Sequence, residues 1–413
     1  MTEIDELLRE FPPGVREHLR QAWDKMPQAA RGPLTEALRG LPGDLGRWRE
    51  LMRLALSHVR MVTGEKRRVA IVGPANVGKS TLYNQLVRNA ADRAEVSAVP
   101  GTTRVSQTAD AGLFAVVDTP GADAVGAVGE AEKERALSTA RDADFLVIVF
   151  DAIQGIKRAE QELFRELQAL EVPHVVVLNK IDLVAGTKER ERVVEAAARN
   201  LGLTADEVVP CVAKDGKRVE RVLLAIAKAE PEIVAALGAA LPEYRRLLAW
   251  SATKKAGATA AAIALAPLPI LDVFPLLALQ SSLVLGIARI YGQRITFARA
   301  RELVVTFGLA FLGRTLFQEV SKLGGPPGWV LAAAIASSTT VVMGRAAAVW
   351  FERGERAKAS DLRAESRALA KRMLRSLQKL GRRRPRREAV EREVEAALSE
   401  VPPTEPGPQA ADP

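Results

Sequence analysis

The eight residues GPANVGKS at positions 73–80 constrain this chain more than any other stretch. They have the spacing G-x-x-x-x-G-K-[ST], follow an apolar run at 69–72 and precede a helical pattern that begins at Thr81. Glycines let the backbone wrap closely around a phosphate group, and exposed N–H groups at a helix N-terminus attract its oxygens. We therefore expect a phosphate-binding loop, with Lys79 reaching the β- and γ-phosphates and Ser80 ligating Mg²⁺.

Strand and helix patterns alternate between residues 67 and 230. Apolar runs predict strands at 68–73, 105–111, 113–118, 144–150, 173–179 and 207–212. Amphipathic patterns predict helices at 79–89, 129–141, 157–170, 187–201 and 216–229. This alternation predicts an α/β domain with a mostly parallel six-stranded sheet and helices on both faces. Ligands bind at the carboxyl ends of the strands in such sheets, where the motifs of this chain fall.

All-α regions are expected on both sides of this domain. Residues 1–66 show helical spacing broken by prolines, and residues 231–350 form an apolar helical region. Residues 351–400 read as a basic amphipathic segment, and residues 401–413 as a disordered tail. The chain therefore divides into an N-terminal helical region, a nucleotide-binding domain at 67–230, and three C-terminal segments.

Two further motifs are expected to lie beside the phosphates. Asp118 ends a strand and opens the sequence DTPG, so its carboxylate would hold Mg²⁺ through water while the Gly121 N–H meets the γ-phosphate. Upstream, the sequence PGTTR at 100–104 precedes a strand. We expect Thr103, rather than Thr102, to close over Mg²⁺ when the γ-phosphate is present. Lys79, Thr103 and Gly121 are thus the predicted catalytic residues.

Two motifs near the end of the domain are typical of guanine recognition. In NKID at 179–182, the Asp182 carboxylate accepts both N–H groups on the Watson–Crick edge of guanine, a pair that adenine lacks. Asn179 and Lys180 would brace the loop and cover the base. The sequence VAK at 212–214 follows the last strand, and the Ala213 N–H would read guanine O6. The full set of predicted nucleotide-binding residues is Asn76, Val77, Gly78, Lys79, Ser80, Thr81, Asn179, Lys180, Asp182, Ala213 and Lys214.

These motifs, in this order and spacing, resemble the TrmE–Era–EngA branch of the translation-factor-class GTPases. The resemblance covers residues 67–230 and implies GTP binding, slow GTP hydrolysis and a switch role. Val105 stands where that branch usually has Asp, and Val212 where it usually has Ser. Neither departure removes a ligand on which the interpretation depends.

The residue after DTPG is Ala122, where Ras-type GTPases place a glutamine that orients water. Intrinsic hydrolysis should therefore be slow. Asn76 matches the asparagine that helps to hold K⁺ beside the phosphates in potassium-stimulated relatives, often across a dimer of G domains. The alternative is that Asn76 only bonds the loop backbone. Arg104 and Arg141 are other possible charge donors, although a solvated surface role suits both.

Composition places the basic character of the chain in one segment. The formal net charge is +9, yet residues 353–387 carry fourteen Lys or Arg and three Asp or Glu, a local net of +11. An acidic partner is expected to bind there. The single cysteine, Cys211, excludes an internal disulfide framework and fits a reducing cytosol.

The apolar C-terminal half has two interpretations. Residues 256–288 carry one charge, Asp272, and residues 323–344 carry none. Because a membrane span needs ~20 apolar residues, these interrupted runs are short for one. They predict either a buried helical core or a hairpin that dips into the bilayer with its tip at 267–275. Asp272 would then be either a helix cap or a functional group in lipid.

The stretch 267–292 resembles an uncharacterised bacterial domain that follows G domains of this kind and is commonly regarded as a membrane protein. We therefore expect a GTP-hydrolysing switch at the cytoplasmic face of a membrane, contacting lipid or a membrane protein through 256–288 and 353–387. The rival function is an RNA-binding GTPase in ribosome or tRNA maturation, with 353–387 as the RNA contact. A third is a scaffold that binds GTP without turnover.

Overall fold

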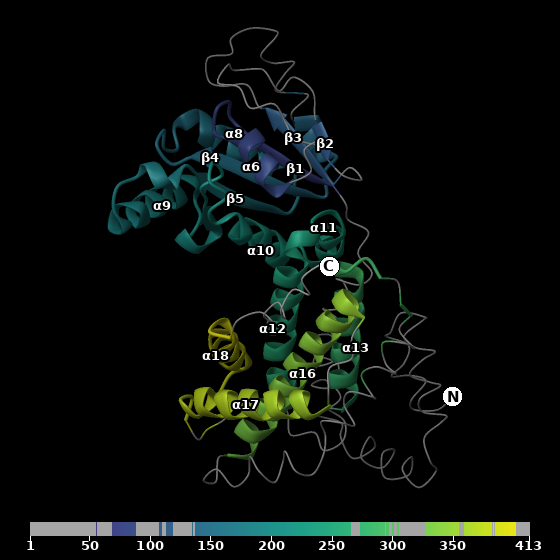
Figure 1. Ribbon diagram of the computed structural model, residues 1–413. Coiled ribbons are helices and arrows are strands. Elements are labelled where there is room, and N and C mark those ends of the chain that lie inside the picture. The colour runs from purple at the N-terminus through teal and green to yellow at the C-terminus, as the bar shows by residue number, and fades with distance from the viewer. Residues whose placement is uncertain are drawn as a thin grey trace, which may run out of the picture.

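An α/β domain and a helical domain are joined through a short helix in the computed structural model of this chain (Figure 1). The model describes residues 55, 68–87, 107–109, 113–118, 134, 137–265, 273–293, 295–296, 300, 304, 327–354, 359–381, 383 and 385–401. Outside these residues lie Thr103, Gly121 and Ala122, nearly all of the predicted N-terminal helical region, most of the predicted helix at 129–141, Asp272 and the C-terminal tail.

The sheet of the α/β domain has the strand order β2-β3-β1-β4-β5-β6. Its strands are β1 (Val69–Gly73), β2 (Gln107–Ala109), β3 (Phe114–Asp118), β4 (Phe145–Asp151), β5 (His174–Asn179) and β6 (Val208–Pro210). Five of these strands run parallel, and the three-residue β2 pairs antiparallel with β3 at the edge. The predicted mostly parallel sheet is confirmed.

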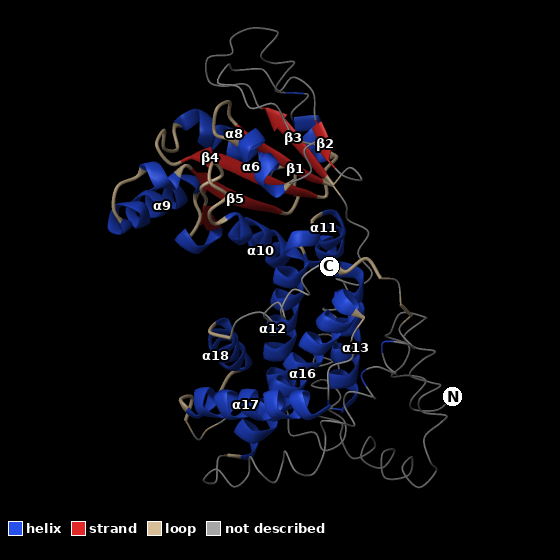
Figure 2. Ribbon diagram, in the orientation of Figure 1, coloured by secondary structure: helices blue, strands red, loops and turns tan. Residues whose placement is uncertain are grey.

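Alternate residues of the central strands enter two different cores. Val147 and Val149 of β4 join a cluster with helices α6 (Lys79–Leu86) and α10 (Val219–Ala229). Their neighbour Ile148 joins the opposite cluster, under helices α8 (Arg158–Gln168) and α9 (Thr187–Leu201). Because helices cover both faces of the sheet (Figure 2), β4 is buried at all seven positions and is apolar up to its last residue, Asp151.

Six α-helices follow the α/β domain among the described residues. They are α11 (Val234–Ala240), α12 (Arg245–Ala264), α13 (Val273–Ile290), α16 (Gly328–Arg353), α17 (Ala359–Gln378) and α18 (Arg387–Ser399). α12 and α16 pack against each other, and α13 joins the same core as α12. On another side, leucines and valines of α17 and α18 share one cluster with α12 and α16. The predicted boundary at residue 350 therefore falls inside α16, and helices on both sides of it form one packed unit.

The apolar helices are largely buried in this unit. α16 is the one helix in the described part of the chain that has the length and composition to cross a membrane, and 83% of its most apolar window is buried inside the protein. The helix extends beyond the uncharged run that ends at Gly344, because it continues through Arg345 to Arg353. Burial of this degree is typical of a core helix, so α16 by itself is weak evidence for a membrane span.

α11 connects the two domains through a continuous apolar core. The cluster that contains Leu82 of α6 and Ile226 of α10 continues through Leu237 of α11 into α12 and α13. Gly238 of α11 lies so close to α13 that a Cβ there would stand 2.6 Å from the carbonyl oxygen of Ile290. The helices that follow the α/β domain are therefore packed directly onto it.

Candidate functional site

The phosphate-binding loop has the predicted strand–loop–helix context. β1 ends at Gly73, and α6 begins at Lys79. The Lys79 side chain is 3% exposed, and its Nζ donates to the carbonyl oxygens of Gly73 (2.8 Å) and Pro74 (2.6 Å). These two carbonyls hold the ammonium group across the loop. Ser80 and Thr81 lie half-buried in the first turn of α6.

Asp118 is brought next to this loop by the sheet register. β1 and β3 are parallel neighbours, and Gly73 is paired with Asp118 at their carboxyl ends. The predicted partners in Mg²⁺ binding, Ser80 and Asp118, thus follow two adjacent strand ends. Thr103 and Gly121, the other predicted catalytic residues, lie outside the described residues, so their placement stays a prediction.

Asn179 joins the guanine motif to the phosphate-binding loop. It ends β5, is 3% exposed, and its Nδ2 donates to the Val77 carbonyl at 2.9 Å. Its Oδ1 accepts the Ala213 N–H, also at 2.9 Å. A Cβ at residue 78 would stand 2.4 Å from Asn179 Nδ2, and φ is +93° there, so both contact and conformation require Gly78. Three loops are therefore fastened by one buried amide.

Lys180 makes a second link between the same loops. Its backbone is left-handed, with φ of 62°, and its Nζ donates to the Asn76 carbonyl at 2.7 Å. The same Nζ lies 2.7 Å from Oδ2 of Asp151, the last residue of β4. Asp151 is 4% exposed, and its Oδ1 also accepts the backbone N–H of Ile153 at 2.7 Å. Lys180 is thus held in place from two sides.

The residues expected to read the base have different surroundings. Asp182 is exposed in a 3₁₀ turn, and its carboxylate makes no hydrogen bond with another described residue. It is therefore available as a pure acceptor. The Ala213 N–H donates to Asn179 Oδ1, and its contact with guanine O6 stays a prediction. Lys214 is exposed, and its carbonyl accepts Gln85 Nε2 at 3.3 Å.

Two residues near the site have roles that sequence analysis missed or left open. Asp151 was missed, although a carboxylate that closes the apolar strand FLVIVFD is itself a signal. Asn76 is exposed with φ of 64°, so its side chain projects from the loop rather than into the core.

Arg141, the other charge donor considered within the described residues, is also exposed. Burial raises the pKa of the Cys211 thiol to about 11, which leaves it protonated and chemically silent beneath the guanine loop.

Two protein families match separate parts of the chain. Residues 68–180 match the family described as 50S ribosome-binding GTPase, and residues 241–379 match a domain of unknown function (DUF697). The second match spans α12 to α17, in agreement with their shared core. The chain therefore carries an Era-like GTPase domain with a P-loop, followed by a helical domain of unknown function.

Several curated relatives are similar to the GTPase part. The chain is 35% identical over 212 residues to the tRNA modification GTPase MnmE of Synechocystis, which spans 48% of this chain and 41% of that protein. It is 39% identical over 132 residues to GTPase Der of Thermotoga petrophila, covering 30% of each. It is 33% identical over 173 residues to GTPase Era of Afipia carboxidovorans, covering 40% of this chain and 53% of that protein. The chain thus spans about half or less of the length of these relatives.

Proposed function

We propose that this protein is a GTP-binding and GTP-hydrolysing switch whose helical domain delivers the output. The observation that carries the proposal is the double link at the candidate site, where Asn179 and Lys180 tie the guanine motif to the phosphate-binding loop. Such links fix the spacing between the groups that hold a base and those that hold its phosphates. A preorganised site of this kind binds one nucleotide geometry with little ordering cost.

Guanine specificity follows from the Asp182 carboxylate. It accepts two N–H groups from guanine, whereas adenine offers a mismatched edge and would leave a desolvated carboxylate unpaired. Lys79 and the first turn of α6 supply positive charge and N–H donors for the β- and γ-phosphates. The substrate class is therefore a guanosine triphosphate.

The residues present fit a Mg²⁺ ion that arrives with the nucleotide. Ser80 supplies a hydroxyl in the first turn of α6, and the register places Asp118 at the adjacent strand end. Within the described part of the chain, no group of three His, Cys, Asp or Glu side chains could hold a metal alone. Ser80, Asp118 and Thr103 would hold the ion jointly with phosphate oxygens, and it would neutralise charge that develops during hydrolysis.

Slow turnover is part of this proposal because Ala122 cannot orient water. Asn76 is exposed at the phosphate-binding loop, where a K⁺ ion held by its side chain would add positive charge beside the phosphates. A dimer of G domains is one arrangement that would enclose such an ion. Binding of K⁺ by Asn76 and dimerisation of the G domain are the two most specific parts of the proposal.

The helical domain is the output because its core continues from the nucleotide-binding fold. Leu82 lies on the helix that follows the phosphate-binding loop, and its cluster extends through α10 and α11 to Leu279 of α13. A shift of α6 or α10 on nucleotide exchange would be transmitted through packed side chains, which have discrete arrangements and do not deform continuously.

The partner proposed for the output is the cytoplasmic surface of an anionic membrane. α17 buries Leu369, Met373 and Leu377, so its opposite face is exposed and carries Lys371 and Arg375. Each basic residue near an anionic surface contributes about 1 kcal/mol. Burial of α12 and α16 in the domain favours attachment through this basic face over insertion of a hairpin.

The second candidate partner is RNA or the ribosome. It is supported by the names of the matching family and relatives, which refer to ribosome binding and tRNA modification. The same basic face would contact phosphates of the RNA backbone. Its described cations lie on one helix that is anchored by aliphatic side chains, without the stacking aromatic platform typical of single-stranded RNA readers.

A pair of charge-reversal variants distinguishes these partners. Lys371→Glu with Arg375→Glu should reduce sedimentation with vesicles of phosphatidylcholine and phosphatidylglycerol at least fivefold. The matched control, Lys188→Glu with Arg199→Glu on exposed positions of α9, changes the same charge and should bind as the unmodified chain does. Binding of purified ribosomes that is lost in the α17 variant, with no vesicle binding by the unmodified chain, would favour the RNA function instead.

The switch itself is tested by nucleotide binding and turnover. The purified full chain should bind GTP and GDP with Mg²⁺, reject ATP in competition, and release phosphate from GTP slowly. Equal affinity for ATP and GTP would refute guanine recognition, whereas tight GTP binding without phosphate release would leave a GTP-binding scaffold.

A further inference from the structure

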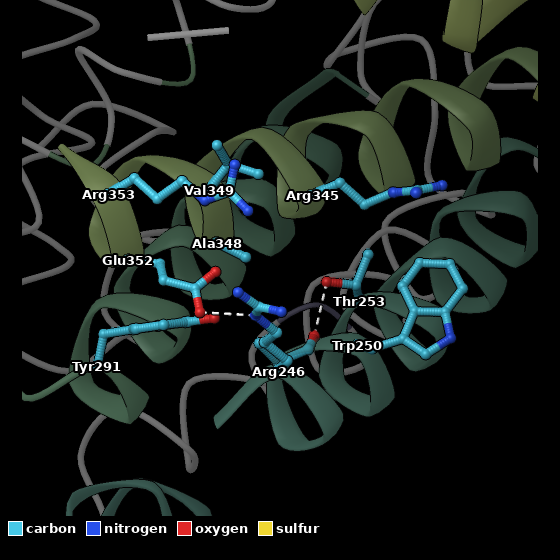
Figure 3. A pocket seen from close by; sticks show the side chains of 10 residues that line it. Arg246, Trp250, Thr253, Tyr291, Arg345, Ala348, Val349, Glu352 and Arg353 are labelled. Atoms are coloured by element: carbon cyan, nitrogen blue, oxygen red, sulfur yellow. Dashed lines mark hydrogen bonds and ion pairs between the residues drawn. The ribbon is translucent and has the colours of Figure 1, made fainter. Parts of the chain in front are cut away.

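A small cleft in the helical domain is lined by three arginines. It lies between the first half of α12, the C-terminal end of α16 and the residue that follows α13 (Figure 3). Polar and aromatic side chains dominate the lining: Arg246, Trp250, Tyr291, Arg345, Glu352 and Arg353. None of them belongs to the nucleotide site described above. The cleft is therefore distinct from the nucleotide site.

The charges around this cleft do not cancel. Arg246 Nε pairs with Glu352 Oε1 at 2.6 Å, and Arg345 Nη1 pairs with Glu365 of α17 at 2.7 Å. The Arg345 guanidinium also lies 5.5 Å from the centroid of the Trp250 ring. Arg353 is exposed and has no ion pair with another described residue. The carboxylates of Glu352 and Glu365 thus face three guanidinium groups, and the excess positive charge, on Arg353, favours binding of an anion.

The buried hydroxyl of Tyr291 is an independent indication that the cleft binds a hydrogen-bonding ligand. Its side chain is 7% exposed, and its hydroxyl has no hydrogen-bond partner among the described residues. In Figure 3 the ring extends along the cleft, and its hydroxyl end points toward Glu352 and Arg246. Burial raises the pKa of Tyr291 to about 12, so the group stays protonated and can donate. A buried donor without an acceptor is costly, and in native proteins it calls for water or a ligand.

We infer that this cleft binds a phosphate-bearing anion, held by the Tyr291 hydroxyl and the guanidinium groups of Arg353 and Arg246. Arginine forks match phosphate oxygens in a bidentate fashion, and a neutral hydroxyl adds a donor without adding charge. Glu352 acts as the internal competitor, because its carboxylate holds Arg246 when no ligand is present. The ligand class is a phosphate monoester or inorganic phosphate, either free in solution or as the headgroup of a lipid.

The cleft lies next to the contacts that pack the helical domain against α11. Tyr291 directly follows Ile290, whose carbonyl packs on Gly238 of α11, the helix that joins the two domains. Arg245, the neighbour of Arg246, donates from Nε to the Gly238 carbonyl at 2.7 Å. A ligand in the cleft therefore sits one residue away, on two separate segments, from the contacts that attach the helical domain to α11.

The test is phosphate binding by the full chain already saturated with GDP and Mg²⁺, so that the P-loop is filled. Calorimetric titration with inorganic phosphate should show a site that Arg353→Gln weakens about tenfold and Tyr291→Phe weakens severalfold. Glu352→Gln should strengthen binding, because it removes the competitor. The matched control, Arg289→Gln at an exposed position of α13, should leave it unchanged.

A second arm separates the two sources of the anion. Flotation with phosphatidylcholine vesicles that contain phosphatidate should depend on the same residues if the ligand is a headgroup, and phosphate alone should then bind weakly. Binding of phosphate with none to vesicles identifies a free anion. The inference is overturned if phosphate and phosphatidate both fail to bind the GDP-loaded chain, or if Arg353→Gln, Tyr291→Phe and Glu352→Gln all bind as the unmodified chain does. Lower thermal stability of Tyr291→Phe without ligand would also count against it, by revealing a structural role for the hydroxyl.

Discussion

The ammonium group of Lys180 and the carboxylate of Asp151 lie 2.7 Å apart at the carboxyl ends of two adjacent strands. The parallel pairing of β4 with β5 sets Asp151 opposite Asn179, the residue before Lys180. Asp151 is almost fully buried, whereas Lys180 is about one-third exposed. The buried Asp151 carboxylate therefore holds the Lys180 ammonium group where it also donates to the Asn76 carbonyl of the phosphate-binding loop.

Asp151→Asn tests whether this pair positions the guanine motif. Asparagine keeps an oxygen for the Ile153 N–H but removes the charge that restrains Lys180. We expect GDP affinity to fall about tenfold, as suits the loss of one charge-assisted hydrogen bond, with a small change in thermal stability. Fluorescent GDP titration measures this effect. Asp142→Asn, at an exposed position before β4, is the control and should bind as the unmodified chain does. Unaltered affinity in Asp151→Asn would show that the pair has no positioning role.

Asp182→Asn tests the identity of the base. The amide offers a donor where guanine also offers donors, so GTP affinity should fall by roughly a hundredfold or more. Xanthosine triphosphate presents an acceptor at that edge and should become the preferred nucleotide. Competition titration with GTP, ATP and xanthosine triphosphate gives the ranking. The assignment fails if the variant retains its preference for GTP.

Lys79→Ala and Ser80→Ala test the phosphate and Mg²⁺ contacts. Each removes a group that acts directly on the phosphates or the ion, so phosphate release should become undetectable in both. Because Lys79 also bridges the Gly73 and Pro74 carbonyls, its removal should loosen the loop as well. Ser138→Ala, on an exposed hydroxyl elsewhere in the domain, is the control. Persistent turnover in both variants would place the reaction at another site.

Asn76→Ala tests the proposed potassium dependence. Turnover of the unmodified chain should be faster in KCl than in NaCl at equal ionic strength, and the variant should lose that difference. The Asn76 carbonyl keeps its bond to Lys180 in the variant, so GDP affinity should stay within about threefold. Equal rates in the two salts for the unmodified chain would eliminate the ion from the mechanism.

The α/β domain was predictable from sequence because its signals are local and redundant. The apolar run before Gly73, and the polar residues Asp118 and Asn179 at the ends of two later strands, indicate both the strands and the site. Strand and helix ends were less accurate, since α10 begins only at Val219 after a left-handed Arg218. The Asp151–Lys180 pair joins residues 29 positions apart, and no local pattern encodes such a contact.

The helical domain was less predictable because its apolar runs could be buried either in lipid or in a protein core. Alternation of small apolar residues in α12 and α16 suits a lipid environment and a tightly packed protein core equally well. Among the described residues, Gly344 of α16 lies against Thr253 of α12, and aliphatic side chains of α17 and α18 share a cluster with both helices. The basic segment was read as a separate appendage because charge dominates its composition, although its leucines belong to the same core.

The close contact of Gly238 with Ile290 has a thermodynamic consequence. Separation of the two domains would expose one continuous apolar core, so heating should melt them in a single cooperative transition. A nucleotide at one hundred times its dissociation constant adds about 2.7 kcal/mol to the free energy of unfolding of the unit that contains its binding site. Helices such as α13, which touch no nucleotide, would then gain protection from amide hydrogen exchange when GDP binds far from them.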